Sequence, residues 1–282
     1  MMLVLLRVAV LFHFACLSSQ LCPQEENSAL LHFKTQLITN ITIYDEDDNY
    51  AEVCPHGYPK MRTWHNGTDC CSWMGVTCDS LSCHVIGLDL SCSGLVGNIH
   101  PNSTLFHHLT HLQTLSFAYN HLLGNDQLPS QFGGLVSLTH LNLSHCWFKG
   151  DIPSQISHLF KLQSLDLSLN FELRWKETTW KRMLQNATAL SEIVLDYTNM
   201  SSIGSTPNPL SLIANMSSSS LITTLSLPKT GIRGHLTGDI LCLPNLQYLN
   251  LDANHGILIH VPKLNCSTSL LSVLDLSWCQ FP

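Results

Sequence analysis

The 282-residue sequence has few charged residues, and basic residues are the scarcer kind. Only 12% of the residues are charged, and 13 lysines and arginines stand against 20 aspartates and glutamates, so the formal net charge is −7. Proteins that bind nucleic acid need a basic face for the phosphate backbone. The charge balance therefore argues against nucleic acid as a partner, while a hydrophobic content of 45% is enough for a sizeable core.

The motifs of the common catalytic and cofactor sites are also missing. The sequence contains no G-x-G-x-x-G, no P-loop, no H-E-x-x-H and no G-x-S-x-G pattern. The nearest approach to a metal cluster is His107-His108-x-x-His111, and a zinc site needs further ligands and groups that orient them. We therefore expect no enzymatic activity, no catalytic residue, no cofactor and no metal site.

An uninterrupted run of about 18 apolar residues, the length that a membrane-spanning helix requires, is absent as well. The N-terminal apolar segment contains Arg7 and His13 and ends in the small residues Ser18 and Ser19. This pattern is typical of a secretory signal peptide, so we expect residues 1–20 to be removed in the secretory pathway.

Cysteine, in contrast, is plentiful, as is typical of an oxidising compartment. Of the 12 cysteines, Cys16 would leave with the signal peptide, and because an odd number remains at least one thiol should be free or pair outside the chain. Asn-x-Ser/Thr sequences, each a weak signal alone, strengthen the prediction of a secreted or cell-surface glycoprotein. The predicted glycosylation sites are Asn40, Asn66, Asn102, Asn142, Asn186, Asn199, Asn215 and Asn265.

Eight copies of the pattern L-x-x-L-x-L-x-x-N/C follow one another at intervals of 24 to 32 residues. Repetition at such a period is the signature of a stacked array. Five copies fit the template, one of them with Phe in place of a Leu, and in three weaker copies Ser or Thr holds the last position. The five begin at Leu112, Leu138, Leu162, Leu246 and Leu271, and the weaker three at Val85, Leu190 and Ile222.

The central L-x-L of each copy predicts a short strand whose alternate side chains face opposite sides. The leucines then point inward, and because one repeat cannot bury its apolar side alone, successive repeats must stack. The Asn or Cys stands where the chain leaves the strand, and its side chain can bond backbone groups that would otherwise be unpaired. The pattern predicts an α/β solenoid with a parallel concave β-sheet.

A second pattern, x-x-G-x-I-P, follows several copies. The segment from Phe148 to Pro153 is complete, and those beginning at Leu95 and Ile232 are partial. With this pattern the repeats resemble the plant-specific leucine-rich repeat. The resemblance implies a second short sheet and a twist that makes the array a right-handed superhelix.

Residues 21–83 are expected to cap the apolar end that stacked repeats expose. Apolar spacing within residues 27–37 predicts a helix, with Asn27 as its N-cap. The segment from Trp64 to Asp79 resembles the W…DCCxWxGVxCD motif of plant leucine-rich-repeat N-terminal domains.

By this resemblance Cys22 would pair with Cys70, and Cys71 with Cys78, although spacing alone cannot choose among the connectivities. The other cysteines have no such guide. Cys54 lies in an insertion, with Cys92 suggested as its partner, and Cys83 stands where the motif usually has glycine, which makes it a candidate for the odd thiol. The sequence leaves the pairing of Cys146, Cys242, Cys266 and Cys279 open.

The Cys54 loop and the context Gly87-Leu-Asp-Leu-Ser-Cys-Ser-Gly94 resemble plant receptor-like proteins. The resemblance implies a non-catalytic module that perceives a microbial or plant-derived protein or peptide in defence signalling, at the plasma membrane and with a co-receptor kinase. The chain would be the N-terminal portion of such a protein, with a cap over 21–83 and about eight repeats over 84–282, the last one truncated.

The alternative is a secreted, apoplastic inhibitor of a microbial cell-wall-degrading enzyme, similar to polygalacturonase-inhibiting proteins. Such proteins share the cap and the repeat. The insertion around Cys54 and the uneven repeat lengths count against this alternative.

Outward-facing positions of the strands are expected to form columns across the sheet and to make the ligand surface. Aromatic and long polar residues dominate recognition surfaces, although residue type alone does not establish binding, and these side chains could merely shape the surface. A glycan on Asn142 would block part of this face. The predicted ligand-surface residues are Tyr119, His145, Tyr197, Lys229, Tyr248 and Trp278.

Residues 171–186 form an irregular repeat that is rich in basic residues and contains Trp175 and Trp180. Two interpretations are open. The segment could be an exposed loop that binds an anionic wall polysaccharide, or a helical convex segment with its tryptophans packed inside.

Overall fold

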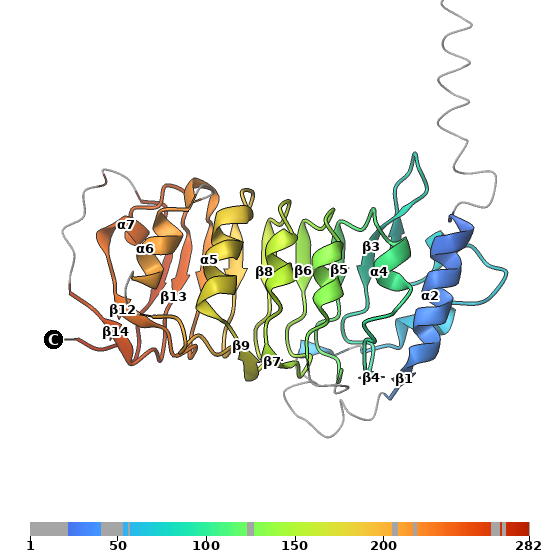
Figure 1. Ribbon diagram of the computed structural model, residues 1–282, viewed down its shortest axis with the longest axis horizontal. Helices are drawn as coiled ribbons and strands as arrows, with labels where there is room; N and C mark the ends of the chain where they lie inside the picture. The colour runs from blue at the N-terminus through green and yellow to red at the C-terminus, as the bar shows by residue number, and fades with distance from the viewer. Residues whose placement is uncertain are drawn as a thin grey trace, which may run out of the picture.

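The computed structural model describes residues 22–40, 53–55, 57–122, 127–204, 208–216, 219–260, 266 and 269–281. The predicted signal peptide and Asn265 lie outside these residues. Short strands stand side by side along an elongated array, with the cap at one end (Figure 1). The main sheet has the order β15-β13-β11-β10-β8-β6-β5-β3-β2, and all its neighbours are parallel except β2 and β3. Its strands are β2 (Val76–Cys78), β3 (Val85–Asp89), β5 (Thr114–Ser116), β6 (His140–Asn142), β8 (Ser164–Asp166), β10 (Glu192–Val194), β11 (Thr224–Ser226), β13 (Tyr248–Asn250) and β15 (Val273–Asp275).

Helical segments and short secondary sheets complete the turns of the solenoid. The helices are α2 (Gln24–Gln36), α4 (Leu105–His108), α5 (Glu177–Asn186), α6 (Pro209–Ala214) and α7 (Gly238–Leu241), and the 3-10 segments are η3 (Lys60–Thr63), η4 (Cys70–Ser72), η5 (Ser130–Gly134), η6 (Ser154–His158) and η7 (Ser219–Leu221). The secondary sheets pair β1 (Leu37–Thr39) with β4 (Leu95–Gly97), β7 (Lys149–Asp151) with β9 (Glu172–Arg174), and β12 (Arg233–His235) with β14 (Gly256–Leu258). The predicted second sheet is therefore present, and in Figure 1 these pairs follow one long side of the array.

The repeated leucines form one continuous ridge inside the solenoid. Strand register places Leu88 beside Leu115, and the ridge continues through equivalent residues to Leu249 and Leu274. From Leu88 to Leu249 the ridge is at most 2% exposed, whereas Leu274 on the edge strand β15 is 47% exposed. The predicted solenoid is thus confirmed, and its stability comes from apolar burial between neighbouring repeats.

Where the template ends in asparagine, this side chain fixes the turn that follows the strand. The Asn120 Nδ2 group donates to the carbonyls of Leu90, Phe117 and Ala118 at 2.8, 2.8 and 3.2 Å. Its Oδ1 accepts the backbone N–H of Leu95 at 2.8 Å and that of Ser93 at 3.2 Å. One fully buried amide therefore joins two successive repeats and satisfies backbone groups that water cannot reach.

Shorter side chains at the same position make fewer bonds. The Cys146 thiol donates to the carbonyls of Phe117 and Ser144, and the Thr198 hydroxyl donates to the carbonyl of Leu195 at 2.8 Å. Cys146 and Cys279 are the free cysteines among the described residues, and both are buried. Burial raises the pKa of the Cys146 thiol, which keeps it protonated and able to donate.

The cap is built around the two tryptophans of its motif. The rings of Trp64 and Trp73 stack with centroids 5.4 Å apart, and the Nε1 groups donate to the carbonyl of Met74 and the hydroxyl of Thr68. The Asp69 carboxylate accepts the backbone N–H groups of Cys22, at the start of the cap, and of Cys71. Disulfides join Cys22 to Cys70, Cys71 to Cys78, Cys54 to Cys92, and Cys242 to Cys266.

One expectation about the cap is wrong. The helix α2 begins at Gln24 after Pro23, so Asn27 is not its N-cap and instead donates to the carbonyl of Thr68 at 2.9 Å. The acidic residues Glu25 and Glu26 extend the helix toward its N-terminus because the helix dipole favours negative charge there. Cys83 is disulfide-bonded in the full chain. Which thiol is the odd one after removal of residues 1–20 stays a prediction.

The irregular repeat at residues 171–186 consists of strand β9 followed by helix α5, with both tryptophans packed inside. Trp175 and Trp180 are fully buried and meet edge to face at 5.2 Å between ring centroids. Lys176 pairs with Asp151 at 2.8 Å on the surface. The exposed-loop interpretation is therefore wrong as far as the tryptophans are concerned.

Replacement of Asn120 by alanine should destabilise the protein more than the loss of any shorter residue at the equivalent position. Each buried group that loses its partner costs about 1–3 kcal/mol, so we expect Asn120→Ala to lower the free energy of unfolding by about 3 kcal/mol. The matched control Thr198→Ala should cost about 1 kcal/mol. Urea unfolding followed by circular dichroism measures both, and equal costs would contradict this account of the turn.

Candidate recognition surface

The column that was predicted to lie on the face of the sheet lies in the turns beyond it. Strand β6 ends at Asn142, whereas His145 stands in the turn that follows. Every residue of this column has a left-handed backbone, with φ between 50° and 62°. We name the column the turn ridge, and its residues are Cys92, Tyr119, His145, Leu169, Tyr197, Lys229, Ala253 and Trp278.

A ladder of backbone hydrogen bonds holds the turn ridge in this conformation. The N–H of Tyr119 donates to the carbonyl of Ser144 at 2.9 Å, and Ser144 is the residue before the next ridge residue. The same bond repeats from Cys92 to Ala253 at 2.8 to 3.0 Å. Left-handed backbone costs an L-residue about 1–2 kcal/mol, so the ladder must offset this strain in each repeat.

Two aromatic clusters stand on the turn ridge. In one, Tyr119 meets His145 edge to face at 5.3 Å, and His145 contacts Trp147 at 5.8 Å. In the other, Phe171 meets Tyr197 at 5.4 Å, and the Lys229 ammonium lies 4.9 Å from the Tyr197 ring centroid. Four of the six predicted residues are thereby brought together in two pairs.

The other two predicted residues stand apart. Tyr248 is on strand β13, where its hydroxyl accepts from the Asn250 amide at 3.3 Å, and Trp278 is 74% exposed beside the edge strand. Sequence reasoning missed Trp147 and Phe171, which follow a ridge residue by two positions. That spacing is the signal that could have found them.

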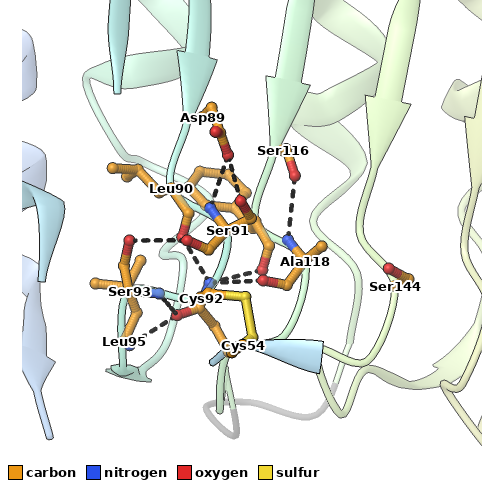
Figure 2. Close-up of a disulfide and its surroundings, with 12 residues drawn as sticks. Cys54, Asp89, Leu90, Ser91, Cys92, Ser93, Leu95, Ser116, Ala118 and Ser144 are labelled. Atoms are coloured by element: carbon orange, nitrogen blue, oxygen red, sulfur yellow. Dashed lines mark hydrogen bonds between the residues drawn. A yellow bond between two sulfur atoms is a disulfide. The ribbon is translucent and has the colours of Figure 1, made fainter. Parts of the chain in front are cut away.

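The disulfide between Cys54 and Cys92 occupies the N-terminal end of the turn ridge. Figure 2 shows it at the turn after β3, where the Cys92 N–H donates to the carbonyl of Ala118 at 3.0 Å. Tyr119 packs against this bridge. The Cys54–Cys92 disulfide therefore marks the N-terminal end of the turn ridge.

Two acidic side chains lie near the turn ridge: Asp166 is the last residue of β8, and Asp196 stands in the turn after β10, directly before Tyr197. We call these two carboxylates the acidic face. Burial raises the pKa of Asp166. Burial, and secondarily the nearby Asp166 charge, raises the pKa of Asp196. The pKa of the Tyr119 phenol is also raised by burial and by Asp166. These groups resist ionisation because burial disfavours their charged forms, so a cation placed here would be attracted to both carboxylates.

The predicted glycosylation sites differ in exposure. Asn40, Asn66, Asn102 and Asn215 are exposed, whereas Asn142, Asn186 and Asn199 are half-buried. The Asn142 Oδ1 accepts from the backbone N–H and the hydroxyl of Ser144. Occupancy of all these sites stays a prediction.

Comparison with known families gives matches at both predicted parts of the chain. The "Leucine rich repeat N-terminal domain" family matches residues 50–79, and the "Leucine Rich Repeat" family matches residues 137–159. Receptor-like protein 9DC1 from Solanum pimpinellifolium is 37% identical over 257 residues, which cover 90% of this chain and 28% of that protein.

The chain belongs to the leucine-rich-repeat proteins and is a relative of the plant receptor-like proteins. Receptor-like protein Cf-9 from Solanum pimpinellifolium is 37% identical over 94% of this chain, and Receptor-like protein 6 from Arabidopsis thaliana is 34% identical over 92% of it. This leucine-rich-repeat chain spans 26% to 30% of the length of these relatives. They are named as receptor-like proteins rather than enzymes, in agreement with the prediction of a non-catalytic chain.

Solved structures show the same leucine-rich-repeat fold. A plant ice-binding protein superimposes with a TM-score of 0.57 at 21% identity, covering 93% of this chain and 81% of that one. The PEPR1-AtPEP1 structure gives a TM-score of 0.57 at 21% identity, covering 92% and 36%. Among the residues that the structure describes, no helix is both long and apolar enough to cross a bilayer.

Replacement of Ala253 by glycine should stabilise this leucine-rich-repeat chain, the reverse of the usual effect. Its left-handed backbone, with φ of 54°, strains alanine but not glycine. After the entropy cost of glycine, we expect a gain of about 0.5 kcal/mol in the free energy of unfolding. The control Ala29→Gly in helix α2 should lose about 1 kcal/mol. Urea unfolding measures the free energy of unfolding of both variants, and a loss of stability in both would refute the strain argument.

Removal of the Asp166 charge should stabilise the fold at neutral pH. Because folding raises the pKa of Asp166, its carboxyl contributes stability only while protonated, and the contribution is lost as pH rises through the folded-state pKa. Asn142 accepts the equivalent two bonds one repeat earlier, so Asp166→Asn preserves them.

We therefore expect Asp166→Asn to raise the free energy of unfolding at pH 7, with the gain fading as pH falls through the raised folded-state pKa of Asp166 and absent below the ordinary aspartate value of 3.8. Asp275 is the control, because bonds from Ser277 lower its pKa and Asp275→Asn should bring no gain. Denaturation at several pH values compares the two variants, and a pH-independent difference would contradict the assignment.

Proposed function

We propose that the chain is the ligand-recognising N-terminal part of an extracellular receptor-like protein, and that its ligand is a peptide or protein segment carrying both cationic and aromatic side chains. The observation that carries this proposal is the position of Asp166 and Asp196 beside the turn ridge. A cation from the ligand would sit on the acidic face while apolar groups contact the aromatic clusters.

The aromatic clusters suit the aromatic side chains of such a ligand, and the acidic face suits its cationic ones. Aromatic side chains supply large contact area at small entropic cost and are the commonest anchors of interfaces. Half-buried carboxylates attract lysine or arginine more strongly than exposed ones, since solvent screens them less. Lys229 at the second cluster extends the surface toward acidic groups on the same ligand.

The domain organisation, the location and the partners of the chain are proposed from its similarity to the receptor-like proteins. We propose removal of residues 1–20 as a signal peptide, a cap over 21–83 and about eight repeats over 84–282. We further propose that the protein is displayed at the plasma membrane, that it perceives a microbial or plant-derived ligand in defence signalling, and that it acts with a co-receptor kinase. The predicted glycans and the four disulfides among the described cysteines suit an extracellular setting.

Peptide selection on the purified chain tests the proposed ligand class. A random peptide library displayed on phage should yield peptides enriched in lysine or arginine together with tryptophan, tyrosine or phenylalanine. The double variant Asp166→Asn and Asp196→Asn should bind a selected synthetic peptide at least about tenfold more weakly, the loss of one favourable charge contact. Tyr197→Ala should weaken it similarly.

The control is Lys161→Ala, an exposed residue outside the turn ridge, which should leave affinity unchanged. Selection of peptides that bind the double variant Asp166→Asn and Asp196→Asn as tightly as the unchanged chain would overturn the proposal. Stoichiometric inhibition of a fungal polygalacturonase by the same protein would favour the inhibitor hypothesis instead.

A further inference from the structure

Three side chains from separate parts of the sequence meet where the cap joins the first repeats. Glu26 lies on helix α2, His84 directly precedes strand β3, and His111 lies between α4 and β5. The Nδ1 atom of His84 is 2.6 Å from Oε1 of Glu26. One ligand atom from each of the three residues lies within 4.8 Å of the other two.

Glu26 is placed as a metal-binding carboxylate is placed in proteins. It is only 3% exposed, and its Oε2 accepts the backbone N–H of Val85 at 2.7 Å. This bond fixes the carboxylate and leaves Oε1 directed at His84. Metal-ligating carboxylates are oriented by such hydrogen bonds.

The two histidines are stacked, with ring centroids 3.9 Å apart and planes inclined by 20°. Two charged imidazolium rings at this distance would repel each other, whereas two neutral rings can share one cation. His111 is exposed, so rotation of its side chain can turn a nitrogen lone pair toward the other ligands. His84 is half-buried, which leaves room for its Nδ1 to move from Oε1 to the spacing of about 3.3 Å that two zinc ligands need.

We propose that Glu26, His84 and His111 bind a divalent transition-metal ion of the zinc type. One carboxylate oxygen and two imidazole nitrogens match the donors that zinc prefers, and water completes a tetrahedral set. The ion replaces the proton between His84 and Glu26, and that proton leaves to solvent. Because the ligands come from the cap helix and from two successive repeats, the bound ion ties the cap to the solenoid.

The neighbouring histidines are a built-in control. His107 and His108 belong to the H-H-x-x-H pattern with His111, but they lie on α4, and His108 approaches Glu25 at 3.8 Å instead. A site made by the sequence motif would need His107. A site made by the fold needs Glu26 and His84 and does not need His107.

Zinc binding by the purified, chelator-treated full chain tests the proposal. Competition with a chromophoric chelator should show one tight equivalent of Zn²⁺, and ZnCl₂ should raise the thermal midpoint of unfolding. In His111→Gln the affinity should fall at least about tenfold and the thermal shift should disappear. His111 is exposed, so this variant should still fold, and its unfolding midpoint without zinc verifies that.

The control His107→Gln should keep the affinity and the thermal shift of the unchanged chain. His84→Gln, made in parallel, should lose both. Absence of a tight equivalent in the unchanged chain would overturn the proposal. So would a loss of zinc binding in His107→Gln with retention in His111→Gln, because that result places the ion on the sequence motif.

Discussion

The buried amide, thiol or hydroxyl that closes each turn is the interaction on which the rest of this structure depends. Asn120 joins the carbonyl of Leu90 in one repeat to that of Phe117 in the next. The chain must therefore leave the strand within three residues, and only a left-handed residue just before the Asn, here Tyr119, achieves so sharp a turn. The position of the turn ridge is thus a consequence of how the core is closed.

Sequence reasoning succeeded where one residue type has one physical role. A leucine such as Leu141 can only face inward, and the fixed spacing of the repeats then sets the strand register. It failed where the role depends on three-dimensional neighbours. The alternation of a strand was extended past its end to His145, although the strand stops at Asn142 and the backbone changes hand. Asn27 likewise looked like a helix cap until helix α2 proved to begin earlier.

The candidate sites follow the same division. Tyr197 and Lys229 were found as members of a column, yet their contact with each other and with Phe171 depends on the turn geometry. The sequence shows where the aspartates of the acidic face stand, but not that their pKa values are raised. That shift is caused by burial, which the spacing of residues in the sequence does not reveal. Glu26 and His84 are far apart in the chain, so no local motif could have linked them.

The turn ridge separates what folds the protein from what a ligand would contact. Its backbone makes the same bond in successive repeats, whereas its side chains project outward and belong to seven residue types, from Ala253 to Trp278. None of the eight is β-branched, since such residues are strained most in this conformation. Within that limit the fold does not dictate the side chain. A surface whose chemistry can change from repeat to repeat without disturbing the core suits recognition, because specificity can then be altered at little cost in stability.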